Sequence, residues 1–231
     1  MDYRKTAGVI AVITPLWFLC VYLVMAGLRP EYSYMTKAIS ELGSVHAPHK
    51  WFWNVLGYVL PGLAIVFLGM GLGREFSDTS RYAWIPVFAL AASGLCMVAA
   101  GIFPGNFVNR SATTMILHAV GSLGSGFAFL IAGFGFPMVF RKKAHWHWVV
   151  WPTLALVIAF VLSVVATGAL RSIAMPGLGQ RLGFACFFLW IGLAGLALAR
   201  SSDLGKHDPV PINHDGRGGH SSEESNACRN P

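Results

Sequence analysis

The sequence predicts an all-α fold, a bundle of six transmembrane helices followed by a disordered polar tail. Six apolar segments alternate with short polar connections, and each approaches the roughly 20 residues that a helix needs to cross about 30 Å of hydrocarbon. Hydrophobic residues make up 55% of the chain and charged residues only 12%, which excludes an ordinary water-soluble domain. The 26 glycines are typical of helices that pack closely in a bilayer.

The six spans are expected, in order, over residues 7–28, 52–72, 83–103, 114–140, 147–169 and 182–199. The first follows Arg4 and Lys5, as a signal peptide would, but its apolar run is too long for one and ends without a small-residue cleavage site. We therefore expect it to be retained as a span. Tryptophans open the second, third and fifth spans, where their amphipathic rings settle at headgroup depth. Residues 1–200 are thus predicted to form one transmembrane domain.

The remaining residues, 201–231, differ completely in composition. Ser, Asp, Gly, His, Pro and Asn dominate this segment, and few apolar residues are left. Such a segment does not bury enough surface to offset the entropy of ordering it, so we predict a disordered tail.

The distribution of Lys and Arg predicts the orientation. Nine lie at the N-terminus, after spans two and four, and after the last span, and six lie in the other three connections. The nine are Arg4, Lys5, Arg74, Arg81, Arg141, Lys142, Lys143, Arg200 and Lys206, and the six are Arg29, Lys37, Lys50, Arg110, Arg171 and Arg181. The positive-inside rule then places both termini in the cytoplasm.

Several functional classes find no support in the sequence. The net charge of +7 is scattered over loop ends rather than striped on one face, so no nucleic-acid partner is expected. His46 and His49 share a loop with Glu41, but no span carries a preorganised pair such as HxxxH, and we predict no metal. Phosphate loops, dinucleotide fingerprints and nucleophile elbows do not occur, and no cofactor is expected.

The three connections predicted to face outward carry the distinctive polar residues. The first contains Ser40 and Glu41 in a short turn, the second contains Asn106, and the third contains Arg171 and Arg181. One ionisable residue, His118, lies about one turn inside the fourth span, so it should face the bundle. We expect Glu41 and Arg181 to be its partners, which would place an acid, a base and a cation at one outer mouth.

Three interpretations of this mouth remain open. It could be a polar network that holds the long first loop over the bundle. It could bind an anionic headgroup, with Arg171 and Arg181 contacting phosphate as arginine does well. It could also be catalytic, with His118 or Glu41 as general acid or base.

A set of short motifs resembles the family catalogued as domain of unknown function 998. The motifs are Tyr32-Ser33, Ile39-Ser40-Glu41-Leu42-Gly43, Phe103-Pro104, His118 and Gly179-Gln180-Arg181. The resemblance covers about residues 7–200 and implies a six-span integral membrane protein of the bacterial inner membrane. It also implies an acidic residue soon after Phe103-Pro104, where this chain has Gly105 and Asn106. A weaker resemblance to the eukaryotic Frag/DRAM/Sfk membrane proteins implies a lipid-linked role.

From these observations we favour a non-enzymatic membrane protein that engages a lipid headgroup or a small amphiphile, with membrane lipids as its partners. The expected binding residues are Ser40, Glu41, Asn106, His118, Arg171 and Arg181. A membrane-embedded hydrolase that uses His118 and Glu41 as acid and base is the alternative. A small-solute transporter ranks third, because the spans lack the repeated charged positions that an ion pathway would need. The sequence leaves the oligomeric state open.

Overall fold

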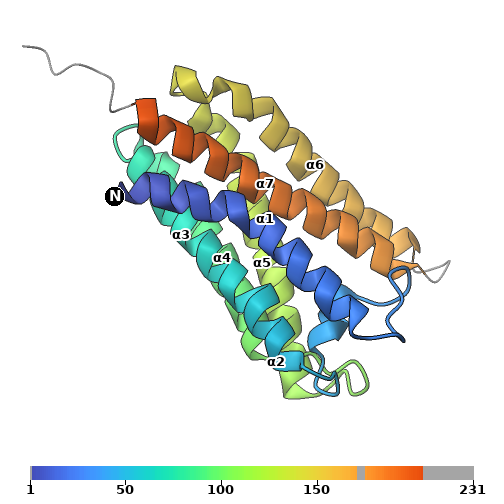
Figure 1. The fold of residues 1–231 in the computed structure, drawn as a ribbon. Coiled ribbons are helices and arrows are strands. Elements are labelled where there is room, and N and C mark those ends of the chain that lie inside the picture. Colours follow the sequence, from blue (N-terminus) through green and yellow to red (C-terminus); the bar gives the residue numbers. More distant parts are fainter. Residues whose placement is uncertain (1, 171–174, 205–231) are drawn as a thin grey trace, which may run out of the picture.

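The structure is a computed structural model that describes residues 2–170 and 175–204, and these residues contain helices and no strand (Figure 1). The elements are α1 (Tyr3–Gly27), η1 (Ile39–Gly43), α2 (Lys50–Trp53), η2 (Asn54–Val59), α3 (Leu60–Glu75), η3 (Arg81–Ala83), α4 (Trp84–Ile102), α5 (Thr113–Phe140), η4 (Ala144–Trp146), α6 (His147–Leu170) and α7 (Pro176–Leu204). Segments η1, η3 and η4 are 3₁₀ turns, and η2 is a π-helical segment that joins α2 to α3.

Six helical segments in the described part of the chain are long and apolar enough to cross a membrane. They are Tyr3–Gly27, Lys50–Glu75, Arg81–Ile102, Thr113–Phe140, Ala144–Leu170 and Gly177–Asp203. Each coincides with one of the spans predicted from the sequence, although the first and third predicted spans extend one residue further, so the prediction of an all-α, six-helix membrane protein is confirmed.

The last helix extends further than expected. Residues 201–204, which we had placed in the disordered tail, continue α7 to Leu204. Two hydroxyls hold this end: Ser202 donates to the carbonyl of Leu198, and Ser201 donates to a carboxylate oxygen of Glu75. The rest of the predicted tail, residues 205–231, lies outside the described residues.

The helices form a closed ring. Going round it, α1 packs against α3, α3 against α4, α4 against α5, α5 against α6, α6 against α7, and α7 against α1 (Figure 1). Contact between α5 and α6 is the least extensive of these six. The ring is therefore closed most loosely between α5 and α6.

The π-helical segment precedes a proline that leaves one of its carbonyls without a backbone donor. In the π register an amide pairs with the carbonyl five residues before it, as the amide of Leu60 does with Val55. Residue 61 is proline and has no amide hydrogen for the carbonyl of Leu56. The indole of Trp17 on α1 donates to that carbonyl instead, at 2.9 Å. The irregular turn is thus tied to the neighbouring helix.

Two glycines allow α3 and α4 to approach closely. A Cβ atom added to Gly94 would lie 2.5 Å from the carbonyl oxygen of Gly62, and one added to Gly62 would lie 2.7 Å from the carbonyl oxygen of Gly94. Backbone atoms have little freedom to move aside, so only glycine fits at this crossing. Such contact between small residues is a common way for helices to associate in a bilayer.

We expect Gly94→Val to destabilise the protein by about 1–3 kcal/mol, because the added side chain overpacks this crossing. The measurement is thermal unfolding in one mild detergent. Gly27→Val is the matched control, since a Cβ there meets nothing within 4 Å. Equal melting temperatures for the two variants would contradict the prediction.

Candidate functional site

The end of the bundle that the sequence predicts to face outward, named the outer end for that prediction, is closed by the first loop, which Arg181 fixes in place. The Nε of Arg181 donates to the Tyr22 hydroxyl at 2.7 Å, Nη2 to the Tyr32 hydroxyl at 2.7 Å, and Nη1 to the carbonyl of Lys37 at 3.0 Å. The guanidinium also lies over the rings of Tyr22, Tyr32 and Tyr34, at 5.5–5.7 Å from their centres. Three of its five N–H groups are therefore used to join α7 to α1 and the loop.

Tyr32 completes this attachment. Its hydroxyl accepts from Arg181 and donates to the carbonyl of Ala38 at 3.1 Å. Burial raises the pKa of Tyr32 well above its ordinary value, against the opposing effect of Arg181, so the hydroxyl stays protonated and able to donate.

The turn η1 lies over the start of α7. The side-chain oxygen of Gln180 accepts from the amide of Ile39 at 2.6 Å, and Ile39 and Leu42 are buried. Ser40 is also buried, and its side chain lies close to the hydroxyl of Tyr58 on η2. The predicted site residue Ser40 thus lies inside the bundle's outer end.

The Glu41 side chain stabilises the turn η1, to which it belongs. One carboxylate oxygen accepts from the amide of Ala38 at 2.9 Å, which is the side-chain half of a capping box. The other lies 3.4 Å from the ammonium of Lys37, and the Glu41 carbonyl accepts from Arg29 at 2.9 Å. These contacts hold the loop together and do not reach His118.

His118 is buried between α4 and α5. Its Nδ1 lies 2.8 Å from the carbonyl oxygen of Ala100 and 3.1 Å from that of Phe103. Carbonyls only accept, so Nδ1 carries a hydrogen and donates it. The Ala100 carbonyl would ordinarily bond to the amide of residue 104, which is proline and has none. His118 therefore caps the C-terminal end of α4.

The sequence-predicted residues lie at one end of the bundle but do not form one cluster. The expected contacts of His118 with Glu41 and Arg181 are wrong. His118 is bonded to backbone carbonyls, Glu41 to its own loop, and Arg181 to tyrosine hydroxyls and a loop carbonyl. Asn106 accepts from the amide of Asn109 at 2.8 Å and shapes its own turn. Arg171 lies outside the described residues.

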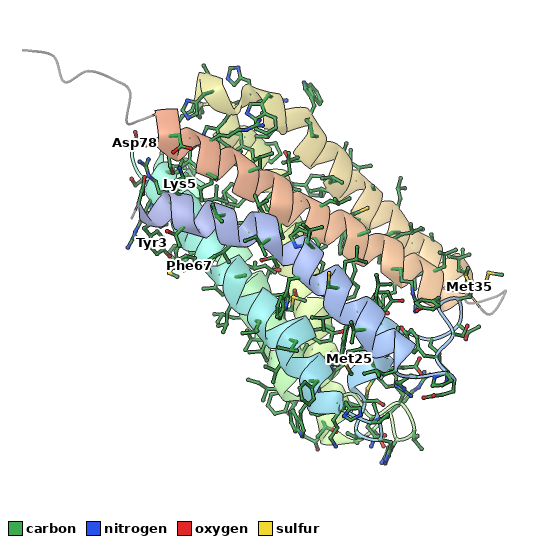
Figure 2. The ribbon with its side chains drawn as sticks, in the orientation of Figure 1. Tyr3, Lys5, Met25, Met35, Phe67 and Asp78 are labelled. Carbon is green, nitrogen blue, oxygen red and sulfur yellow. The ribbon has the colours of Figure 1, made fainter. Side chains whose placement is uncertain are left out.

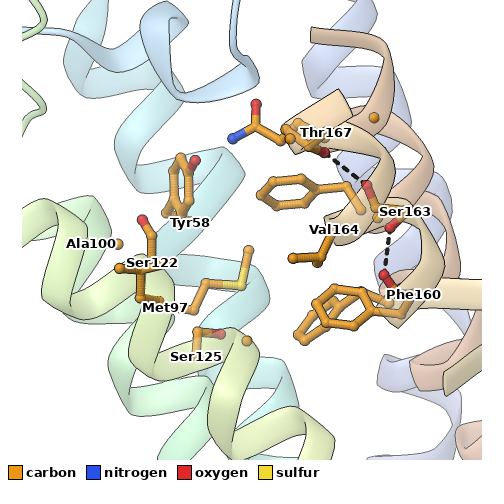
Figure 3. Close-up of a pocket in the computed structure, with 17 residues that line it drawn as sticks. Tyr58, Met97, Ala100, Ser122, Ser125, Phe160, Ser163, Val164 and Thr167 are labelled. Atoms are coloured by element: carbon orange, nitrogen blue, oxygen red, sulfur yellow. Dashed lines mark hydrogen bonds between the residues drawn. The ribbon is translucent and has the colours of Figure 1, made fainter. Parts of the chain in front are cut away.

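A cavity of about 460 Å³ lies beside these residues, within the apolar part of the bundle. It is lined by α4, α5, α6 and α7, and by Tyr58 of η2 (Figure 3). Two of the side chains that line it, Leu123 on α5 and Val164 on α6, are 74% and 56% exposed on the outer surface of the bundle. The cavity therefore opens sideways between α5 and α6, towards the hydrocarbon of a surrounding bilayer.

The polar groups of the cavity are hydroxyls and one amide. Ser163 and Thr167 on α6 donate to carbonyls of their own helix, at 2.6 and 2.8 Å. Ser122 lies on the opposite wall, below Tyr58, and does not donate to a carbonyl of its own helix (Figure 3). Its oxygen is buried and has no hydrogen-bond partner among the described residues. Within the described chain no Asp, Glu, Lys, Arg or His lines the cavity, and no group of three potential metal ligands occurs.

The opposite end of the bundle holds a charged cluster that the sequence reasoning missed. Glu75, 2% exposed, accepts from Arg4 and Ser201, each at 2.8 Å. Lys143 and His145 approach the same carboxylate at 3.4 and 3.6 Å. These residues come from α1, α3, α7 and the segment before α6. Figure 2 places Lys5 and Asp78 at this end, away from Met25 and Met35.

The cluster has only a faint signal in the sequence, a single acidic residue where the second span ends among cations. Asp78 lies 3.3 Å from Lys143, and the pKa of Asp78 is lowered by a hydrogen bond to its own backbone and by Lys143. Glu75 thus joins three spans and the polar segment between α5 and α6.

The comparisons with known proteins identify a family and nothing beyond it. The family model described as "Protein of unknown function (DUF998)" matches residues 12–197. No curated protein and no solved structure matches the chain. The resemblance to the Frag/DRAM/Sfk proteins stays a prediction.

We expect Glu75→Gln to lower the free energy of unfolding by about 3 kcal/mol, because breaking a buried ion pair leaves its partners uncompensated. Chemical denaturation in detergent measures the loss. Asp78→Asn is the control, since Asp78 is 72% exposed and contacts the same Lys143, and it should cost at most about 1 kcal/mol. Similar losses in both variants would show that burial of Glu75 is unimportant.

Arg181→Lys should loosen the first loop while the bundle stays folded. An ammonium keeps the charge but does not reproduce the planar set of bonds to Tyr22, Tyr32 and Lys37. Hydrogen exchange of residues 30–45 should rise severalfold, with unchanged exchange in α3 and α4. Arg110→Lys, on the exposed second outer connection, is the control and should leave the first loop as protected as in the wild type.

Proposed function

We propose that this chain, which belongs to the DUF998 family of proteins of unknown function, is an integral membrane protein that binds one lipid or small amphiphile in the cavity between α5, α6 and α7. The observation that carries the proposal is the sideways opening of that cavity. A molecule dissolved in the bilayer reaches it between α5 and α6 without crossing water.

The size and lining of the cavity support this function. A volume of about 460 Å³ falls within the range of small-molecule sites, and most of the lining is apolar, with a few polar groups that fix orientation. Phe160, Phe184 and Phe187 supply the apolar wall for a chain. Tyr58 and Gln180 lie towards the outer end, where η1 covers them through Ile39 and Ser40. The occupant's polar group would therefore lie at the outer end.

The hydrolase and transporter alternatives gain less support. His118 and Glu41, the proposed acid and base, do not contact each other, and neither lines the cavity. A transporter needs a route between the two ends of the bundle. The opposite end is held by Glu75 and its partners, and the described cavity opens to the side.

The proposed setting is the bacterial inner membrane with both termini in the cytoplasm. The end that carries Glu75 also holds Arg141, Lys142 and Arg200, and the guanidinium groups of Arg141 and Arg200 lie over Trp151 and Trp148 at 5.6 and 5.1 Å. Cations beside interfacial tryptophans suit the cytoplasmic face and its anionic lipids. The cavity's polar end would then face the outer leaflet.

Filling the cavity tests the function. A Cβ added to Gly126 meets only the ring of Phe160, at 3.6 Å, so Gly126→Leu should fold and occupy part of the cavity. Native mass spectrometry of the protein from mild detergent should show a lipid bound to the wild type that is reduced at least fivefold in this variant. Gly27→Leu, outside the cavity, should retain it. The proposal is wrong if Gly126→Leu keeps the same lipid in the same amount.

A further inference from the structure

Buried serine and threonine hydroxyls within the described spans have hydrogen-bond partners, and Ser122 is the exception. Ser93 on α4 bonds to Ser125 on α5, and others bond within their own helix. Thr14, Thr153, Ser163 and Thr167 each donate to a carbonyl three or four residues earlier in their own helix. This internal bond is the usual way for a hydroxyl to be satisfied in hydrocarbon, where water is not available. The Ser122 oxygen is also buried, but it has no partner among the described residues.

The orientation of Ser122 explains the difference. Its side chain lines the cavity and lies across from Ser163 and below Tyr58 (Figure 3). A buried hydroxyl without a partner costs about 1–3 kcal/mol, so a position that keeps one is expected to have a use for it. Because its oxygen exposes almost no surface, a rotation of the Ser122 side chain about the Cα–Cβ bond would bring the hydroxyl to a ligand in the cavity, which would supply the missing partner.

A second donor lies at the outer end of the same cavity. The Gln180 oxygen is used by the amide of Ile39, which leaves the NH₂ of this side chain to serve the cavity that Gln180 lines. An amide nitrogen only donates, and a serine hydroxyl donates readily. The group that these two side chains suit is therefore an oxygen acceptor.

The surroundings favour an uncharged acceptor. Among the described residues no cation lines the cavity, and η1 covers its outer end. The neighbouring Arg181 is engaged by Tyr22, Tyr32 and the loop backbone. A phosphate or carboxylate held under this cover would be desolvated without a counter-charge, at a cost of several kcal/mol. A carbonyl oxygen carries no such penalty.

We propose that the cavity selects a neutral lipid that carries a carbonyl group, either a glycerolipid ester or an isoprenoid quinone, and that Ser122 donates to the carbonyl oxygen. This inference rests on the proposed function, because it names the chemistry of the occupant of the same cavity. It assigns Ser122 as a residue that determines specificity.

Photolabelling in phosphatidylcholine nanodiscs tests the ligand class. The probes are a diacylglycerol and a phosphatidic acid that carry the same diazirine acyl chain, so they differ only in the charged group. The diacylglycerol should label peptides of α5, α6 and α7 at least fivefold more strongly than the phosphatidic acid. Competition by unlabelled diacylglycerol or by a quinone of similar chain length distinguishes the two sources of the carbonyl, and an alkane should not compete.

Ser122→Ala tests the residue. Labelling by the preferred probe should fall roughly three- to tenfold, the loss expected for one hydrogen bond. The melting temperature should stay the same or rise, because an unpartnered hydroxyl is removed. Ser202→Ala is the matched control: its hydroxyl is buried and bonded to Leu198, so the variant should lose stability and keep labelling.

The outcomes separate this inference from the proposed function. Equal labelling by both probes, competition by the alkane, or wild-type labelling of Ser122→Ala would overturn the inference and leave lipid binding intact. Phosphatidic acid labelling that falls in Arg171→Ala would assign a charged headgroup instead. If neither probe nor the quinone reaches the cavity, the proposed function fails as well.

Discussion

The structure depends on one requirement of the bilayer, that a backbone carbonyl in hydrocarbon must find a donor within the protein. Several prolines remove donors within the helices, and at positions 61 and 104 a side chain from another helix supplies one. Trp17 bonds to the carbonyl of Leu56, and His118 bonds to that of Ala100. A local interruption in one helix thereby becomes a tie between two, and these ties set how α1 meets η2 and how α4 meets α5.

The two ends of the bundle are closed by different chemistry. At one end a buried carboxylate, Glu75, collects side chains from several helices by charge. At the other end Arg181 is surrounded by tyrosine rings and hydroxyls and by loop carbonyls, with no carboxylate among its described contacts. Between these closed ends the ring of helices is loosest between α5 and α6, and the cavity lies at that position.

Hydropathy was sufficient to predict the fold, because the thickness of a bilayer sets the length of each apolar segment. It also placed Glu41, His118 and Arg181 correctly at one end of the bundle. Their contacts could not be predicted from the sequence. The actual partners include the backbone carbonyls of Ala100 and Lys37, and since every residue carries a carbonyl, the sequence does not mark which one a side chain will contact. Glu75 and Ser122 were missed for a related reason. A lone acid at a span end and a lone serine within a span acquire meaning only from neighbours far along the chain.

Under the proposed function, the sideways opening between α5 and α6 determines which ligand concentration the protein responds to. A ligand that enters from water is sampled at its aqueous concentration, whereas a ligand that enters between two helices is sampled at its mole fraction in one leaflet. Occupancy of such a cavity follows the composition of the surrounding bilayer, and lateral diffusion delivers the ligand. A change in lipid composition would therefore alter occupancy without any change in the water on either side.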